Sequence, residues 1–421
     1  MKIKKPRLRL SKLRQLDIMM CLMLVLALGF RTSYTSWEKN VSTILIIVIF
    51  VLMAMSRGMK IPVRLAKKYL LWYTIVVFIC SISYFWAQVN NQTYVYALIK
   101  DVFVPYVFVV LALVFYLKYA ETPAKLFDVF VAAEFLVVLR AVIYTPWREM
   151  LSTFDSRLFA SNLGQNYNDF TTQMALTAVI CAYLAIYKNK KYNIVYVIFM
   201  FFILASASRK AIVVGLAGYV MLYLVSAKYD VKKLFKRIIA IAVICGALLV
   251  LIFTNQSLYS LIGEKLVSMI TTLGQSSSEM VSSVSASDID HSLHGRAVLR
   301  EEAWKQFLNY PIAGLGYYNF QYFNGYGLYA HNNYLELLAD LGIIGFIAYY
   351  SMYFTIIRNA MKVLKRGRER NSYAVFVMVF MIVLLILEYA HITFFRLYAL
   401  IPITMLSLYL DYVKSHREIE A

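Results

Sequence analysis

Residues 41–55 read VSTILIIVIFVLMAM and residues 22–30 read LMLVLALGF, and neither stretch contains a charged residue. Both are apolar on every side, whereas the strands of a membrane barrel alternate apolar and polar side chains. A helix rises about 1.5 Å per residue, so about 20 apolar residues cross a hydrocarbon core of about 30 Å. Similar runs recur and predict an all-α, polytopic membrane protein with twelve transmembrane helices. The predicted spans are 16–30, 41–55, 69–87, 102–120, 124–144, 168–187, 192–206, 210–226, 238–254, 334–357, 373–391 and 394–412.

The overall composition agrees with these spans. Hydrophobic residues make up 61% of the 421 residues and charged residues 16%, against about 45–50% and about 25% in soluble globular domains. This composition excludes a cytosolic enzyme, and it excludes a disordered chain because so much apolar surface cannot remain in water. The four cysteines all fall inside predicted spans without metal-site spacing, so neither a disulfide framework nor a zinc site is indicated.

The net charge of +20 reports mainly on membrane topology. With the amino terminus in the cytoplasm, most of the 43 Lys and Arg residues fall in connections that face the cytoplasm, as the positive-inside rule requires. The cations lie between apolar runs, so they attract anionic membrane lipids and do not indicate a nucleic-acid partner. Both termini are predicted to be cytoplasmic. The predicted organisation is a basic tail at 1–15, helices at 16–254, an extracytoplasmic loop at 255–333, helices at 334–412 and a tail at 413–421.

The long predicted loop at 255–333 has two parts of different character. Its Ser-rich part, residues 275–290 (QSSSEMVSSVSASDID), is typical of a flexible spacer. In the second part the apolar residues from Gly295 to Asn309 recur near helical spacing, and Pro311 ends the run. This pattern predicts a short amphipathic helix inside the loop.

Two arginines mark the beginning of that helix. Arg296 and Arg300 are four residues apart and share a face. Free backbone N–H groups and the helix dipole favour an anion at this end, so a phosphate is a suitable ligand. The alternative is a solvated face on which Arg300 pairs with Glu301 or Glu302.

A histidine precedes the tenth predicted span. Asn333 and Glu336 have the spacing of a capping box, which places His331 just outside the helix at the membrane surface. A histidine there titrates near neutral pH and can serve as a base toward a substrate held under the loop. The alternative is a histidine that only caps the helix by hydrogen bonding.

Two further outer connections carry cations. Residues 206–210 (SASRK) place Arg209 and Lys210 on the side where cations are disfavoured. They bind an anion, or their side chains extend to lipid headgroups. Residues 156–170 (SRLFASNLGQNYNDF) hold Arg157, which is either a further phosphate contact or part of a solvated face.

In this order, these segments resemble the O-antigen ligase and O-antigen polymerase superfamily of bacterial cell envelopes. The matching features are the SASRKA connection at 206–211, the HGR and REEAW sequences and the GLGYYNF turn within 291–320, and HNNYLELLADLGIIG at 331–345. The similarity is strong over about 206–350 and looser over 156–170. The amino-terminal third is similar only in hydropathy, and the Ser-rich insertion before His291 is not typical of the family.

The resemblance implies an inverting, metal-independent and cofactor-free glycosyltransferase of the GT-C-like class in the bacterial cytoplasmic membrane. It implies an active site on the outer face and an undecaprenyl-diphosphate-linked glycan as donor, with a glycan as acceptor. The product is a capsule, exopolysaccharide or O-antigen, and a chain-length regulator and a flippase are implied partners. By this resemblance Arg209 and Arg296 hold the donor diphosphate and His331 is the base. Arg300, Lys210 and Arg157 are added from their spacing and proximity.

Three alternatives remain open from the sequence. A polymerase joins repeat units and a ligase moves the finished glycan to a lipid core or wall acceptor, and both need the same donor site. We favour the polymerase, because ligation to a lipid core requires an outer membrane. A secondary transporter requires paired ionisable residues within the membrane, for which only Glu134, Arg140 and Glu388 are candidates. A structural scaffold would leave the outer Arg and His residues without a task.

Overall fold

The helices of the chain were located in a computed structural model. It describes residues 7–30, 36–56, 58, 61–120, 122–153, 166–206, 208–227, 230–256, 259, 263, 267, 293–366 and 372–420. Across these residues the structure is helical with short connections and contains no strand, which confirms the predicted all-α class. The elements are α1 (Arg7–Gly29), α2 (Ser36–Met55), α3 (Val63–Ile82), η1 (Ser83–Phe85), α4 (Gln92–Leu98), η2 (Ile99–Phe103), α5 (Val104–Tyr119), α6 (Lys125–Tyr144), α7 (Trp147–Thr153), α8 (Tyr167–Tyr187), α9 (Tyr192–Ala205), α10 (Arg209–Val225), α11 (Val231–Thr254), α15 (Leu293–Asn309), α16 (Phe320–Phe323), α17 (Asn333–Arg366), α18 (Ser372–Glu388) and α19 (Leu397–Glu420).

Each predicted span overlaps one or more of these helices. Among the described residues, five helical segments are both long and apolar enough to cross a membrane, and they are Ser36–Met55, Val63–Phe85, Gln92–Tyr119, Tyr167–Tyr187 and Asn333–Lys365. Shorter apolar helices cover Gln15–Gly29, Tyr192–Leu204 and Ser372–Glu388. The protein is therefore a membrane protein with several transmembrane helices, while the count of twelve crossings and the GT-C-like class stay predictions.

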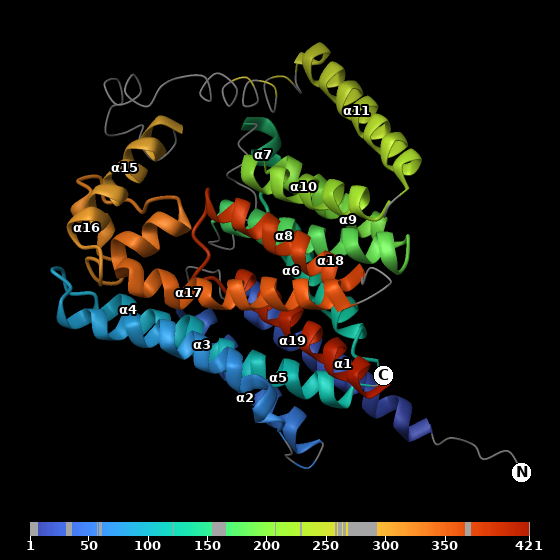
Figure 1. Cartoon of the computed structure of the whole chain (residues 1–421), viewed down its shortest axis with the longest axis horizontal. Helices are drawn as coiled ribbons and strands as arrows, with labels where there is room; N and C mark the ends of the chain where they lie inside the picture. Colours follow the sequence, from blue (N-terminus) through green and yellow to red (C-terminus); the bar gives the residue numbers. More distant parts are fainter. Residues whose placement is uncertain are drawn as a thin grey trace, which may run out of the picture.

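The helix α17 runs through the middle of the molecule. Figure 1 shows α3, α4 and α5 on one side of it and α8, α9, α10 and α18 on the other. The chain packs α17 closely against α3, α15 and α18. The short helices α15 and α16 gather at the end where α17 begins, and α1 and α19 approach each other toward the opposite end (Figure 1). One end of the helical layer therefore carries the segments predicted to form the outer loop.

Small residues set how closely the central helices approach. A Cβ atom on Gly218 of α10 would lie 2.4 Å from Cγ2 of Val179 in α8, so this crossing requires glycine. Almost the whole of α8 is buried. By contrast, α2 exposes Ile44, Val48 and Leu52 at four-residue spacing, an apolar stripe suited to lipid. The close α8–α10 crossing positions the first residues of both helices side by side, where the functional residues lie.

Candidate functional site

The cations of the SASRK connection sit at the first turn of α10. Ser208 has an extended backbone and is the residue before the helix, so Arg209 and Lys210 begin it. The hydroxyl of Ser208 donates to Oδ1 of Asn168 at 3.4 Å, which ties this turn to the start of α8. Burial and the positive charge of Arg296 together lower the pKa of Arg209. Arg209 and Arg296, which lie 87 residues apart in sequence, are therefore neighbours in space.

The helix predicted inside the outer loop is α15, and its arginines differ in how they are held. The Nε atom of Arg296 is buried and has no hydrogen-bond acceptor among the residues that the structure describes. Arg300 donates through Nε to the carbonyl of Arg296 at 3.0 Å, and through a terminal nitrogen to the hydroxyl of Tyr389 at 2.8 Å. Glu302 pairs with Lys305 at 3.6 Å instead of with Arg300. Arg296 is thus the α15 arginine with donor capacity directed into the site.

His331 lies immediately before α17, as predicted, but the cap differs from the prediction. The side chain of Asn332, not Asn333, accepts the N–H groups of Tyr334 and Leu335 at 2.9 and 3.1 Å. Glu336 accepts the N–H of Ala330 at 2.6 Å, so it binds one residue before His331 instead of at the cap. The predicted capping box is therefore wrong. Asn332 caps the helix without a returning bond from Glu336, and the sequence could not separate the two adjacent asparagines because both are suitable caps.

Asn333 has a different task. Its side-chain oxygen accepts the N–H groups of Thr393 and Phe394 at 2.8 and 3.1 Å. Its amide nitrogen donates to the hydroxyl of Tyr350 at 2.9 Å. Asn333 therefore fixes the α18–α19 connection beside the beginning of α17, next to His331.

The surroundings of His331 keep its ring neutral. Its side chain is 8% exposed, its backbone φ is 52°, and its ring lies 4.1 Å from the ring of Tyr329. Burial, followed by the charges of Arg296, Lys210, His391 and Arg300, lowers the pKa of His331 to about 3. The imidazole is therefore in its basic, unprotonated form throughout the physiological pH range.

The structure adds Asp169, His391 and Arg396 to this group, none of which the sequence prediction assigned to the site. Lys210 donates to Nδ1 of His391 at 2.6 Å. Nε2 of the same ring is 3.0 Å from Asp169 and 2.6 Å from the hydroxyl of Tyr398, an arrangement that fits a neutral ring protonated on Nε2. Asp169 also pairs with Arg396 at 3.1 Å. A polar signal existed, since HITFFR at 391–396 interrupts two apolar runs and Asp169 belongs to the polar stretch at 156–170, but nothing in the sequence joins the two segments.

Taken together, these residues form a strongly cationic site. The cationic cluster consists of Arg209, Lys210, Arg296, Arg300 and Arg396, drawn from α10, α15 and the α18–α19 connection. Asp169 is the carboxylate in contact with it. Of the predicted cations, Arg296, Lys210 and Arg300 lie close enough to His331 to lower its pKa, and Arg209 lies beside Arg296. Arg157 lies outside the described residues. An excess of fixed positive charge in a mostly buried place favours a multiply charged anion such as a diphosphate.

The GLGYYNF turn is docked onto a break in α17. Gly342 interrupts the helix with φ 60° and ψ −164°. Around the break, Leu315 donates to the carbonyl of Ala339 at 2.9 Å, and Ile343 donates to the carbonyl of Pro311 at 2.9 Å. The carboxylate of Asp340 accepts three consecutive N–H groups, those of residues 318–320, at 2.8 to 3.1 Å. This docking holds the tyrosines of the turn in place.

The Gly342 break supplies a stability prediction. A Cβ at Gly342 would lie 2.3 Å from the carbonyl oxygen of Ile312, and its backbone conformation is accessible essentially to glycine alone. We expect Gly342→Ala to destabilise the fold by roughly 1–3 kcal/mol or more, measured as a lower Tm and lower membrane abundance. Gly246→Ala in α11, where nothing lies within 4 Å of the added Cβ, is the matched control. An unchanged Tm in Gly342→Ala would contradict the docked break.

A cavity of about 260 Å³ opens beside the cationic cluster. It is called the tyrosine cavity here because Tyr94, Tyr317, Tyr318 and Tyr398 line it, together with Lys39, Asp101 and Arg396. The rings of Tyr94 and Tyr318 are stacked at 3.9 Å. Arg396 and Tyr398 line the cavity and also bind the carboxylate of Asp169, so the tyrosine cavity adjoins the cationic cluster. Asp169 and its partners Arg396, His391 and Tyr398 are called the Asp169 network.

The ionisable residues of the transporter alternative have local partners. Glu134 accepts from Gln173 at 2.9 Å, and Arg140 binds the carbonyl of Gly29 at 2.8 Å and pairs with Glu38 at 3.2 Å. Glu388 accepts from Tyr350 and Tyr353 at 2.9 and 2.6 Å. These groups hold helices together and do not form one pathway.

Residues 194–350 match the model of a family described as O-antigen ligase. No curated protein matches the chain. The matched segment runs from α9 into α17 and contains Arg209, Lys210, Arg296, Arg300 and His331, whereas Asp169, His391 and Arg396 lie outside it. The resemblance of this chain to the O-antigen ligase and polymerase superfamily is thus confirmed, on the segment that carries the cationic cluster and His331.

Proposed function

We propose that this protein is a polysaccharide polymerase that joins undecaprenyl-diphosphate-linked oligosaccharide repeat units. The observation that carries the proposal is the gathering of the cationic cluster around a neutral, buried His331 at the beginning of α17. A cationic site of this kind matches a diphosphate leaving group, and an unprotonated imidazole matches a base. The O-antigen ligase family match supports an enzyme that transfers glycans.

In the proposed reaction an acceptor hydroxyl oxygen attacks the anomeric carbon of the donor sugar from the side opposite the diphosphate. The new C–O bond forms as the bond from the anomeric carbon to the diphosphate oxygen breaks, which inverts the configuration. The electron pair leaves with the diphosphate, whose growing charge Arg209 and Arg296 stabilise with planar, permanently charged guanidinium groups. The hydroxyl proton passes to the imidazole of His331. The products are a longer glycan and free undecaprenyl diphosphate.

Donor binding strengthens the base in this scheme. Without substrate, the pKa of His331 is about 3, partly because of Arg296, Lys210 and Arg300. A diphosphate among these cations offsets their field, which raises the pKa of His331 toward the range useful for a base. The base therefore becomes effective when the donor is in place. No residue in this scheme needs a metal ion, so we expect chelators to leave the rate unchanged.

The acceptor glycan enters the tyrosine cavity in this proposal. Aromatic faces offer apolar contact to the C–H faces of sugar rings, and Asp101, Lys39 and Arg396 offer polar contact to hydroxyl groups. The cavity adjoins the Asp169 network and the cationic cluster, so a glycan there can direct a hydroxyl toward His331.

The acceptor position supplies a further prediction. We expect Tyr94→Ala to raise the KM for a repeat-unit oligosaccharide that carries no diphosphate and can act only as acceptor. The expected rise is roughly three- to tenfold, since an aromatic contact contributes about 0.5–1.5 kcal/mol, while kcat changes little. Tyr84→Ala is the matched control, because Tyr84 is exposed and does not line the cavity. An unchanged KM in Tyr94→Ala would show that the acceptor does not bind in the tyrosine cavity.

The proposed location is the bacterial cytoplasmic membrane, with both termini in the cytoplasm and the site on the outer face. The charge distribution of the connections supports this orientation. Further support is that the described parts of α1 and α19 approach each other away from α15 and α16 (Figure 1). Attachment of a membrane-impermeant reagent to a cysteine introduced at Tyr326, an exposed outer-loop residue, tests the orientation in intact cells.

The function itself is tested by the glycans that accumulate when the gene is deleted. Single repeat units that remain on the lipid carrier support the polymerase. Long chains stranded on the carrier support the second candidate, a ligase that transfers finished glycan to a lipid core or wall acceptor. Normal glycan on the cell surface contradicts both enzymes and favours the transporter or scaffold alternatives.

A further inference from the structure

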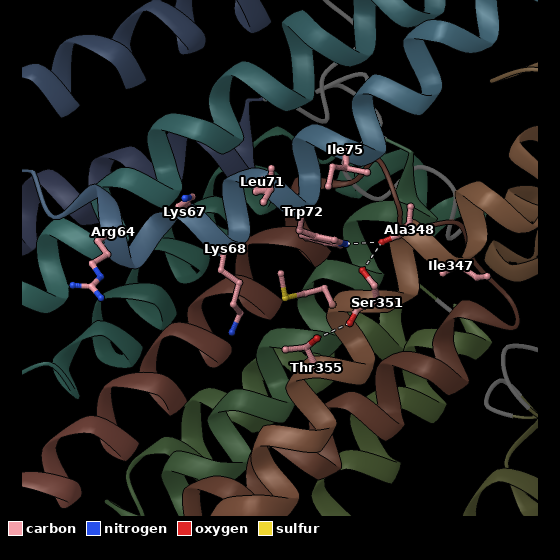
Figure 2. A pocket seen from close by; sticks show the side chains of 11 residues that line it. Arg64, Lys67, Lys68, Leu71, Trp72, Ile75, Ile347, Ala348, Ser351 and Thr355 are labelled. Atoms are coloured by element: carbon pink, nitrogen blue, oxygen red, sulfur yellow. Dashed lines mark hydrogen bonds between the residues drawn. The ribbon is translucent and has the colours of Figure 1, made fainter.

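A second cavity lies between α3 and α17, away from the candidate functional site. Its volume is about 580 Å³, and we call it the basic groove. Figure 2 shows Arg64, Lys67 and Lys68 along the first turns of α3 at one end of the groove, with Ile75 and Ile347 toward the other. The groove therefore has a cationic end and an apolar length, which is the chemical pattern of an amphiphile.

The apolar length of the groove is open to the surroundings of the protein. Leu71 is 54% exposed and Ile347 is 61% exposed. The two hydroxyls that line the groove turn back to their own helix, because Ser351 donates to the carbonyl of Ala348 and Thr355 to that of Ser351, each at 2.8 Å. Because both hydroxyl groups already donate a hydrogen bond, they do not need water molecules in the groove as acceptors. The wall is suited to a hydrocarbon chain.

A small residue, Ala348, lines the groove beside the bond that joins its two helices. The indole nitrogen of Trp72 donates to the carbonyls of Ala348 and Tyr349 at 3.1 and 3.0 Å, which holds α3 and α17 together (Figure 2). Ala348 has no side chain long enough to fill the space beside this bond. The bonded helices thus enclose a groove instead of closing on each other.

The cationic end carries more positive charge than the protein neutralises. Lys68 pairs with Asp411 of α19 at 2.9 Å. Arg64 and Lys67 add two positive charges, and none of the residues that line the groove is a carboxylate. An excess of two cations beside an apolar groove favours an anionic headgroup over a zwitterionic one.

The position of the groove along α3 matches one leaflet of a membrane. Both α3 and α17 belong to the segments long and apolar enough to cross a bilayer. The rise from Arg64 to Ile75 is about 16 Å, close to half of a hydrocarbon core of about 30 Å. At its other end α3 leads into Ser83, whose hydroxyl accepts the N–H of Tyr317 in the docked turn at 2.8 Å. The cationic end therefore lies at the membrane face opposite the candidate functional site.

We propose that the basic groove is a binding site for an anionic phospholipid of the inner leaflet. One acyl chain lies along Leu71, Ile75 and Ile347, and the headgroup phosphate lies at Arg64 and Lys67. The lipid-linked donor is a poor occupant, because its diphosphate belongs to the cationic cluster at the other face. The bound lipid completes the packing between α3 and α17, and so it supports the helix that carries His331 at its beginning. The exclusion of the lipid-linked donor rests on the proposed function, whereas the lining and charge of the groove do not.

The proposal is tested by lipid retention and thermal stability of the full chain in nanodiscs. Native mass spectrometry is expected to find phosphatidylglycerol retained in preference to phosphatidylcholine, and the Tm is expected to be higher in phosphatidylglycerol. The double variant Arg64→Gln/Lys67→Gln is expected to lower phosphatidylglycerol retention about 30-fold, since each cation near a membrane surface contributes about 1 kcal/mol. Ala348→Leu keeps both charges and fills the groove, so it is expected to lower retention as well.

Lys190→Gln/Lys191→Gln is the matched control, because these two exposed cations lie in the α8–α9 connection outside the groove. We expect it to retain phosphatidylglycerol as the unmodified protein does. Equal retention of the two lipids overturns the proposal, and so does a Tm rise in phosphatidylglycerol that persists in both groove variants. Stabilisation by inorganic phosphate alone also overturns it, since an anion without an acyl chain does not need the groove.

Discussion

Replacing His331 by Asn is expected to lower kcat for glycan transfer about 10²- to 10⁴-fold, the usual contribution of a positioned base. Asparagine is chosen because His331 has a φ of 52°, which Asn adopts more readily than Ala. The variant therefore removes the imidazole with little change in backbone energy. The measurement is single-turnover transfer from a lipid-linked donor by protein in nanodiscs, with the Tm as a check on folding.

The pH dependence gives a second readout for His331. The neutral ring is the active form, so activity is lost as pH falls through its pKa. In the free protein that pKa is about 3, so kcat/KM is expected to stay level on the acid side until the protein itself unfolds. Bound diphosphate raises the pKa, so the acid limb of kcat is expected at higher pH than that of kcat/KM.

The control for the histidine is His416→Ala, near the end of α19, which is expected to leave transfer unchanged. If His331→Asn folds normally and transfers glycan at the unmodified rate, His331 is not the base. If it loses activity but keeps the acid limb of kcat, the titrating group is another residue, and His391 becomes the first to examine because it contacts both Lys210 and Asp169.

Replacing Arg296 by Gln is expected to lower kcat/KM for the donor about 10²- to 10³-fold, the range seen when one preorganised donor to developing charge is removed. The guanidinium has a buried Nε without an acceptor, and no carboxylate pairs with it, among the residues that the structure describes. Arg296→Lys is expected to recover only part of the loss, because an ammonium cannot bind two phosphate oxygens with a planar fork.

Lys305→Gln is the matched control for Arg296, since it removes a cation from the same helix on an exposed face, where Lys305 pairs with Glu302. We expect it to change kcat/KM less than twofold. A further consequence concerns His331, because removing the charge of Arg296 raises its pKa toward the ordinary value. In Arg296→Gln the acid limb of kcat/KM therefore moves to higher pH. Full activity in Arg296→Gln would show that Arg296 does not bind the donor diphosphate.

Much of the helix map could be predicted from the sequence, because hydrophobicity is a local property. The run at 41–55 needs no partner to be apolar, and it lies within α2. The helix at 295–309 was predicted two residues short of α15, since its apolar spacing and Pro311 are also local signals. The cap at Asn332 was missed because two adjacent asparagines offer equivalent hydrogen-bonding groups, and the choice depends on where Thr393 and Phe394 lie.

Part of the candidate functional site could also be predicted, because some of its residues lie in one stretch of sequence. Arg209, Arg296 and His331 were predicted from a family pattern within one stretch of chain, and the structure places them near one another. Their partners Asp169, in α8, and Arg396, in the α18–α19 connection, are far apart in sequence. Their pairing at 3.1 Å depends on how α8 packs against α10 and α19, which no local pattern records.

By itself, the sequence determined that this chain is a membrane protein built of helices, and that cations and a histidine lie in its polar connections. Apolar runs and charged connections decide this because each residue's transfer between water and lipid depends mainly on its own side chain. Only the tertiary structure decided that His331 is buried among cationic side chains, which lower its pKa. The same holds for the bonds from Asp340 to the GLGYYNF turn and for the groove with a basic end between α3 and α17. Packing energies fall off over a few ångströms and electrostatic energies weaken with distance, so both depend on which distant segments the fold brings close together.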